Sequence, residues 1–153
     1  MWYLILYAIF AIWVLVDAGK RKNNRIVWSL ATLGLGPLVL PVYFAKRNLK
    51  DGETREGGFG WNVLKNFTLL WTLTILIWGI AGMVGVSVIV GETGDGVEQA
   101  GAVIGGAIGL GMIALLWFVV VVAALLLGMF LKKTGVVEKG PTGLLAANTK
   151  DQE

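Results

Sequence analysis

The 153-residue sequence contains neither cysteine nor histidine. Without these residues the chain cannot form a disulfide, a thiolate metal site, a histidine-ligated haem or a catalytic triad with a histidine base. The commonest metal-binding and acid–base motifs are therefore excluded. We predict no cofactor, no metal site and no enzymatic activity.

Charged residues are also scarce, at 15% of the chain against roughly 25% in soluble proteins. Four stretches contain no Asp, Glu, Lys or Arg: residues 1–16, 26–45, 66–90 and 99–131. A run of about 18 or more such residues is typical of a transmembrane helix. The sequence therefore predicts an all-α integral membrane protein with four hydrophobic helical segments.

Changes in composition divide the chain into an N-terminal membrane hairpin (1–47), a cytoplasmic loop (48–62), a C-terminal transmembrane hairpin (63–131) and a polar tail (132–153). The linker 91–99 carries acidic residues and no Lys or Arg. Because cytoplasmic loops are rich in Lys and Arg, we expect this linker outside and the C-terminus in the cytoplasm, in a bacterial inner (plasma) membrane.

The thirteen Lys and Arg all flank the apolar runs. This pattern predicts contact with the lipid bilayer and no nucleic-acid partner. Asp17 is the one acid at the edge of an apolar run, and we expect it to pair with Lys20 or Arg21 in the next turn.

The second segment, 26–45, contains Gly36, Pro37 and Pro41 near its middle. Proline removes a helical N–H and clashes with the carbonyl four residues earlier, so the helix must kink or break here. A kinked spanning helix is the preferred interpretation, because a re-entrant dip needs protein around its non-helical backbone. The dip stays open as the alternative, since it alone places every Lys and Arg on one side. The side of the N-terminus depends on this choice.

Residues 1–47 resemble the two-helix membrane hairpin at the N-terminus of phospholipase-D-type cardiolipin synthases. The resemblance rests on the following residues of the second segment: Trp28, Gly36, Pro37, Tyr43, Lys46 and Arg47. It implies a pair of membrane-anchoring helices. It implies no activity, because the His-Lys-Asp motifs of that family cannot occur without histidine.

Glycines recur in the last two segments: Gly79, Gly82 and Gly85 in the third, and Gly101, Gly105, Gly109 and Gly111 in the fourth. A four-residue glycine spacing lets a neighbouring helix approach closely. We expect these glycines to pack the two segments into a tight antiparallel hairpin, with Gly85 opposite Gly105 and Gly79 opposite Gly111. The alternatives are a face for self-association and a close approach to a lipid, pigment or quinone.

Three tryptophans lie deep in these segments: Trp71, Trp78 and Trp117. Tryptophan prefers the membrane interface, so a deep one needs a partner for its indole N–H. We expect all three to be buried between helices, bonded to a hydroxyl such as that of Thr68, Thr72 or Thr74 or to a carbonyl. The alternative is a flat hydrophobic cofactor beside them.

No ionisable residue lies within the charge-free runs, and no set of convergent polar groups is visible in the sequence. These features favour a non-catalytic accessory or scaffolding subunit of a larger membrane complex. Its partners would be other membrane subunits or copies of itself. The alternative is a small homo-oligomeric channel or transporter.

Overall fold

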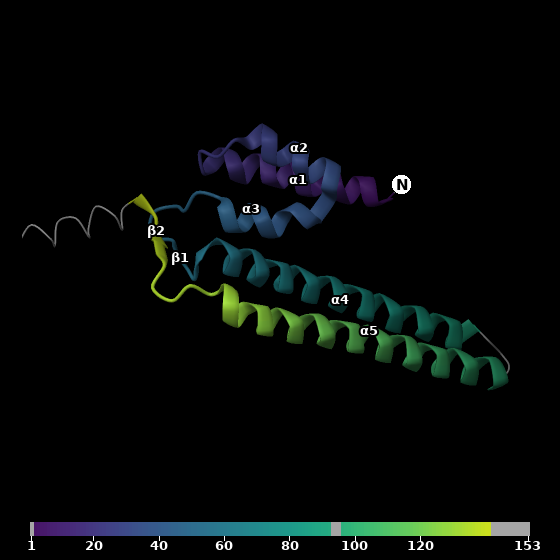
Figure 1. Ribbon diagram of the computed structural model, residues 1–153. Coiled ribbons are helices and arrows are strands. Elements are labelled where there is room, and N and C mark those ends of the chain that lie inside the picture. The colour runs from purple at the N-terminus through teal and green to yellow at the C-terminus, as the bar shows by residue number, and fades with distance from the viewer. Residues whose placement is uncertain (1, 93–95, 142–153) are drawn as a thin grey trace, which may run out of the picture. The chain divides into compact units, whose positions relative to one another are not determined.

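The computed structural model describes residues 2–92 and 96–141, and they are mostly helical (Figure 1). The helices are α1 (Trp2–Lys20), α2 (Arg25–Leu35), η1 (Gly36–Val39, a 3₁₀ helix), α3 (Leu40–Lys46), α4 (Gly58–Glu92) and α5 (Gly96–Leu131). Two short strands are β1 (Thr54–Glu56) and β2 (Val137–Lys139). Within the described residues, three helical stretches are long and apolar enough to cross a membrane: Arg25–Lys46, Gly58–Gly91 and Gly96–Leu131.

The chain forms two compact units. The first contains the described residues up to Phe67 and from Leu127 onward, which are α1 to α3, both strands, the start of α4 and the end of α5. The second contains the rest of the α4–α5 hairpin, from Thr68 to Leu126. Residues 93–95, in the linker predicted to face outside, and tail residues 142–153 lie outside the described residues.

The stretch Arg25–Lys46 is not one continuous helix, because the chain reverses within it (Figure 1). A straight helix of 22 residues would hold its ends about 33 Å apart. Instead, the backbone N–H of Asn48 donates to the Asn23 side chain at 3.2 Å, and the rings of Trp28 and Tyr43 lie 5.3 Å apart. The preferred prediction of a single kinked helix is therefore wrong, because the chain reverses between α2 and α3, as the re-entrant alternative requires.

Gly36, Pro37 and Pro41 explain the reversal. Gly36 ends α2 with φ of +66° and ψ of −154°, a backbone conformation that is essentially restricted to glycine. Pro37 then lies at the start of η1 and Pro41 at the start of α3, positions where a helical N–H has no partner to lose. The three residues predicted to kink a helix thus end one helix and begin the next two.

The reversing α2–α3 pair packs on α1, and α1 covers the turn between them. The Ser29 hydroxyl of α2 donates to the Ala11 carbonyl of α1 at 3.0 Å. The core of this unit is made of buried residues from α1 and α3, with partly buried aromatic residues around them: Val14, Ala18, Leu40 and Tyr43, and Phe10, Trp28 and Phe44. Burial of these side chains holds α3 against α1.

The two strands form an antiparallel ladder that pairs Arg55 with Glu138, and the sequence analysis did not predict them. Glu138 belongs to the stretch predicted as a polar tail, and only its pairing with β1 makes that segment a strand. Strand pairing between residues 83 positions apart leaves no local signal in a three-residue segment. The all-α prediction therefore holds for the helices and misses this small sheet.

In the second unit, α4 and α5 face each other along a narrow seam. The buried or half-buried residues of α5 recur every three or four positions and include Ala102, Gly106, Gly109, Ile113, Trp117, Val120 and Ala124. Alternating steps of three and four are typical of nearly aligned helix pairs, whereas a strict four-residue spacing is typical of steeper crossings. The half-buried face of α5 therefore includes Gly109 of the predicted glycines but not Gly101, Gly105 or Gly111.

Most of the predicted helix-packing glycines lie away from this seam. A Cβ added at any of six of them would meet no non-local atom within 4 Å: Gly79, Gly85, Gly101, Gly105, Gly109 and Gly111. A Cβ at Gly82 would make an ordinary contact, 3.8 Å from Leu110. The glycine in close contact is Gly106, where a Cβ would lie 2.5 Å from a methyl group of Val86. Within a single chain most of the predicted glycines make no close helix–helix contact, because side chains such as Val86 fill the seam.

This difference gives a matched pair of substitutions. Gly106→Leu should lower the free energy of unfolding by about 1–3 kcal/mol, because Val86 is β-branched and cannot rotate away freely in a helix. Gly105→Leu should change it by less than about 0.5 kcal/mol, since nothing lies near that position. Unfolding of both variants in mixed detergent micelles measures the effect. Equal destabilisation by the two changes would show that the seam is assigned to the wrong face.

Candidate functional site

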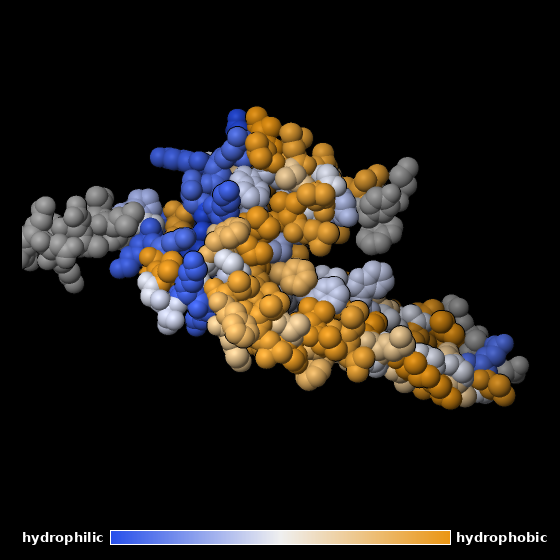
Figure 2. All heavy atoms as spheres, in the orientation of Figure 1, coloured by the Kyte–Doolittle hydropathy of each residue, from blue (hydrophilic) through white to orange (hydrophobic). Residues whose placement is uncertain are grey.

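The polar residues of the first unit gather where α1 and α3 end and the strands lie (Figure 2). At the centre is Arg21, whose side chain is only 4% exposed. Its Nε donates to both carboxylate oxygens of Asp17 at 3.1 and 3.2 Å. Its two Nη groups donate to the two oxygens of Glu53 at 2.6 and 3.0 Å. One guanidinium group thus joins α1 to the loop before β1.

Asp17 accepts hydrogen bonds from two residues of the α3 end as well. The Tyr43 hydroxyl donates to it at 2.7 Å and Arg47 at 3.3 Å. With Arg21, three donors therefore surround this carboxylate, which is 15% exposed. Their convergence satisfies a charge that would otherwise be costly at the edge of an apolar helix.

Arg55 of β1 extends the cluster to the C-terminal strand. It donates to the carbonyls of Ala45 and Arg47, both at 2.6 Å, and to Glu138 at 3.2 Å. The two carbonyls are at the end of α3, where a helix has no internal donors left, so Arg55 caps that helix. We call the set Asp17, Arg21, Tyr43, Arg47, Glu53, Arg55 and Glu138 the arginine network.

The side-chain amide of Asn48 joins two loops at the same end of the unit. The amide donates to the carbonyls of Arg21 and Lys22 at 3.0 and 3.4 Å. These carbonyls follow the end of α1, so the loop after α3 supplies donors for the turn between α1 and α2. The loops at this end are therefore held by specific hydrogen bonds.

The hydrogen bond from Arg21, together with one from the Lys50 backbone, lowers the pKa of the Glu53 carboxyl from 4.5 to about 2. The same bond to Glu53 raises the pKa of Arg21 above its usual value. Both shifts follow from favourable contact between opposite charges, which stabilises each charged form. Glu53 and Arg21 are therefore both ionised at neutral pH.

Because the pKa of Glu53 is lower in the folded state, its contribution to stability is complete above about pH 4.5 and is lost as the pH falls toward 2. We expect the difference in unfolding free energy between the parent protein and Glu53→Gln to shrink over this interval. Thermal or denaturant unfolding at several pH values measures it. In an Arg21→Met background the same comparison should show a much smaller pH dependence, because only the hydrogen bond from the Lys50 backbone remains to lower the pKa of Glu53. An undiminished pH dependence there would contradict Arg21 as the main cause.

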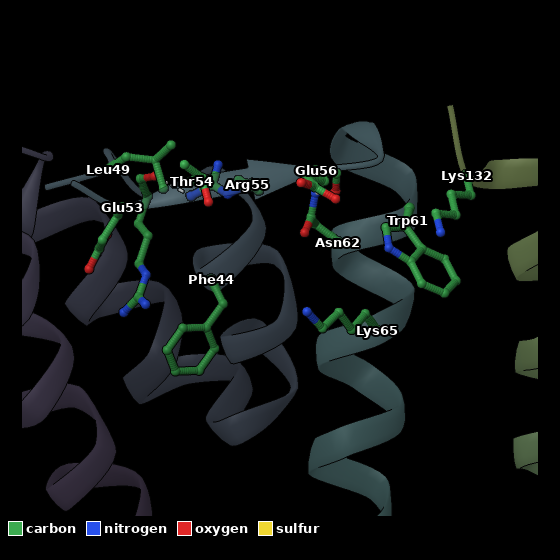
Figure 3. A pocket seen from close by; sticks show the side chains of 11 residues that line it. Phe44, Leu49, Glu53, Thr54, Arg55, Glu56, Trp61, Asn62, Lys65 and Lys132 are labelled. Atoms are coloured by element: carbon green, nitrogen blue, oxygen red, sulfur yellow. Dashed lines mark hydrogen bonds between the residues drawn. The ribbon is translucent and has the colours of Figure 1, made fainter. Parts of the chain in front are cut away.

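A hollow of about 390 Å³ lies beside the arginine network (Figure 3). Its lining includes Phe44, Trp61, Asn62 and Lys65. The Asn62 amide is occupied by the carbonyls of Glu56 and Gly58, at 3.0 and 2.7 Å. Lys65 points from α4 into this space (Figure 3). Two carboxylates line the hollow, Glu53, which is paired with Arg21, and Glu56.

The residues with the most specific geometry are thus those of the arginine network, and most of them were not predicted as site residues. Asp17 was expected to pair with Lys20 or Arg21, and the structure selects Arg21. The roles of Glu53, Arg55 and Glu138 depend on contacts across many residues. Among the described residues, no group of three acidic side chains lies close enough to hold a metal ion.

The three predicted buried tryptophans have different environments. The Trp117 indole N–H donates to the Thr72 hydroxyl of α4 at 3.1 Å, which confirms the predicted kind of partner. Trp71 is half-buried. Trp78 is 58% exposed, so the prediction of a buried side chain is wrong there for a single chain. Its position lies off the narrow seam, because two helices alone cover only one face of each other.

No family model, curated protein or solved structure matches this chain. The function of the chain is therefore inferred from the geometry and chemistry of its described residues.

Proposed function

We propose that the protein is an integral protein of a plasma membrane, with the arginine network at the cytoplasmic surface. Every Lys and Arg of the described residues belongs to the first unit, and none precedes Lys20. The positive-inside rule therefore places this end and the C-terminus in the cytoplasm and the linker 91–99 outside. In this proposal the reversing α2–α3 pair re-enters the cytoplasmic side of the membrane, so α1 alone crosses before it and the N-terminus lies outside.

Single cysteines test this topology, because the chain has no cysteine of its own. Cysteines at Leu4 and Val97 should react with an impermeant maleimide added to intact cells. A cysteine at Asn23 should react only after the cells are opened. Labelling of Asn23 in intact cells would mean that residues 26–45 cross the membrane, which would overturn the re-entrant arrangement.

Within that membrane, the protein serves as a non-catalytic accessory or scaffolding subunit. The observation that carries this proposal is the set of six glycines on α4 and α5 with no neighbouring atom near their open side. Glycine weakens a helix by about 0.5–1 kcal/mol relative to alanine, so glycines on uncovered faces are useful where another helix comes close. The exposed Trp78 and the almost uncovered apolar surface of α4 and α5 add to the area open to a neighbour.

Purification from the native membrane in mild detergent tests the subunit role. We expect other polypeptides to co-migrate with the parent protein and to be lost in Gly101→Leu/Gly105→Leu, while the thermal midpoint of the chain itself is unchanged. Val103→Leu/Ile104→Leu is the matched control, since it changes exposed side chains beside the glycines. Recovery of the parent as a monomer without companions would overturn the subunit role.

A small oligomeric channel or transporter is the second candidate, and the re-entrant pair favours it. Broken helices inside a membrane commonly line water-filled cavities or substrate sites. In this protein such a cavity would form between copies around the turn at Gly36. Reconstitution into liposomes separates the two candidates. A stable homo-oligomer that passes ions would replace the subunit role, whereas absence of flux and of homo-oligomers would exclude the channel.

A further inference from the structure

A second hollow, of about 830 Å³, opens on the polar end of the first unit. Its walls come from three parts of the chain: the turn after α1, the end of α3 with the following loop, and the residues around β2. Five lysines line it, and we call it the lysine hollow: Lys20, Lys22, Lys46, Lys50 and Lys139.

The lysines of this hollow are not balanced by nearby acids. The arginines that also line it are paired within the arginine network, Arg21 with Asp17 and Glu53, Arg47 with Asp17, and Arg55 with Glu138. The salt bridges of the described residues include none of the five lysines. Asp51 is the only other acid in the lining. The hollow therefore carries a strong excess of positive charge.

The backbone around the hollow is held in place. Asn48 and the arginine network bond its walls to one another. Lys22 has a φ of 55°, a left-handed conformation that costs about 1–2 kcal/mol for a residue other than glycine. The backbone of Lys22 is therefore held in one conformation by its hydrogen-bonded neighbours.

Two of the lysines stand directly beside exposed apolar residues. Val16 precedes Lys20 by four residues on α1, and Val42 precedes Lys46 by four residues on α3. Residues four apart share a face of a helix. Val16 is 50% and Val42 37% exposed, so each lysine lies one turn nearer the polar end than an open apolar side chain. This order of charge and apolar surface fits an amphipathic ligand.

We propose that the lysine hollow binds the phosphate headgroup of an anionic phospholipid, with the acyl chains against the apolar faces of α1 and α3. The phosphate takes the place of the missing acidic partners of the lysines, as in other basic pockets at the cytoplasmic surface of membranes. A free phosphate would satisfy the charge but leave the two valines uncovered, so the lipid is the favoured source. The proposal rests on the membrane location proposed above.

The test uses the full-length protein in a neutral detergent and follows its thermal midpoint. Phosphatidylglycerol, phosphatidylcholine and inorganic phosphate are titrated separately, since a ligand that binds the folded state raises the midpoint. The variant is Lys20→Gln/Lys46→Gln. The control is Lys65→Gln/Lys133→Gln, which removes the same charge from the same unit outside the lysine hollow.

We expect phosphatidylglycerol alone to raise the midpoint, and the lysine variant to weaken its apparent affinity by about tenfold or more, against less than about twofold for the control. Equal weakening by both variants would overturn the site, and so would an equal effect of phosphatidylcholine. An equal effect of inorganic phosphate would assign the hollow to a soluble anion instead. Failure of the membrane location would be seen separately, as protein that stays in solution without detergent.

Discussion

Arg21→Met should lower the free energy of unfolding by about 3 kcal/mol. Removing one partner of a buried ion pair costs roughly 3–5 kcal/mol, because the remaining charge is left unpaired. Here Asp17, at 15% exposure, loses the charged donor that bonds both of its oxygens, while Glu53, at 36% exposure, regains part of its hydration. The expected loss is therefore at the lower end of that range.

Two further substitutions show whether the effect comes from geometry or from charge alone. Arg21→Lys keeps the charge but cannot donate to Asp17 and to both oxygens of Glu53 at once, so we expect a loss of about 1–2 kcal/mol. Lys22→Met removes an exposed neighbouring charge and should cost less than about 0.5 kcal/mol. Unfolding in mixed detergent micelles measures all three. If Arg21→Met and Lys22→Met are equally stable, the arginine network does not hold the unit together.

Gly36→Ala should lower the free energy of unfolding by about 3 kcal/mol. The positive-φ backbone at Gly36 costs any other ordinary residue about 1–3 kcal/mol. The new Cβ would also lie 2.6 and 2.8 Å from two ring carbons of Tyr7, so the ring or the turn must move. Overpacking of this kind adds about 1–3 kcal/mol.

Gly34→Ala is the matched control, because the same change two residues earlier meets no atom within 4 Å. It should leave stability unchanged or raise it by up to about 1 kcal/mol, since alanine is the better helix former. A double-mutant cycle with Tyr7→Ala separates the two costs of Gly36→Ala. In the Tyr7→Ala background only the backbone cost should remain. An unchanged cost there would mean that Tyr7 does not pack against the turn.

Several features of this protein could be predicted from local sequence alone. The charge-free runs give the long helices, because a helix satisfies its own backbone wherever side chains are apolar. The clustering of Lys and Arg already favoured a re-entrant second segment, although the kinked span was preferred. The pairing of Asp17 with Arg21 and the bond from Trp117 to Thr72 follow from residue chemistry and from matched depth.

The remaining features depend on how the chain packs. Gly36, Pro37 and Pro41 are compatible with a kink or with a reversal, and contact with α1 favours the reversal by covering the turn. Gly105 and Gly106 point about 100° apart around α5, so Gly105 lies on the open face while Gly106 lies in the seam. A glycine pattern alone does not say which of these two directions meets α4.

The sequence by itself determined what is apolar, where charge is excluded and where helices end, because these depend on each residue and its near neighbours. Only the tertiary structure decided that Arg21 meets Glu53 and that Arg55 meets Glu138, across 32 and 83 residues. Such pairs form when packing brings distant segments together, and no local pattern records which arginine meets which acid. The arginine network, the lysine hollow and the open glycine faces all belong to this second class.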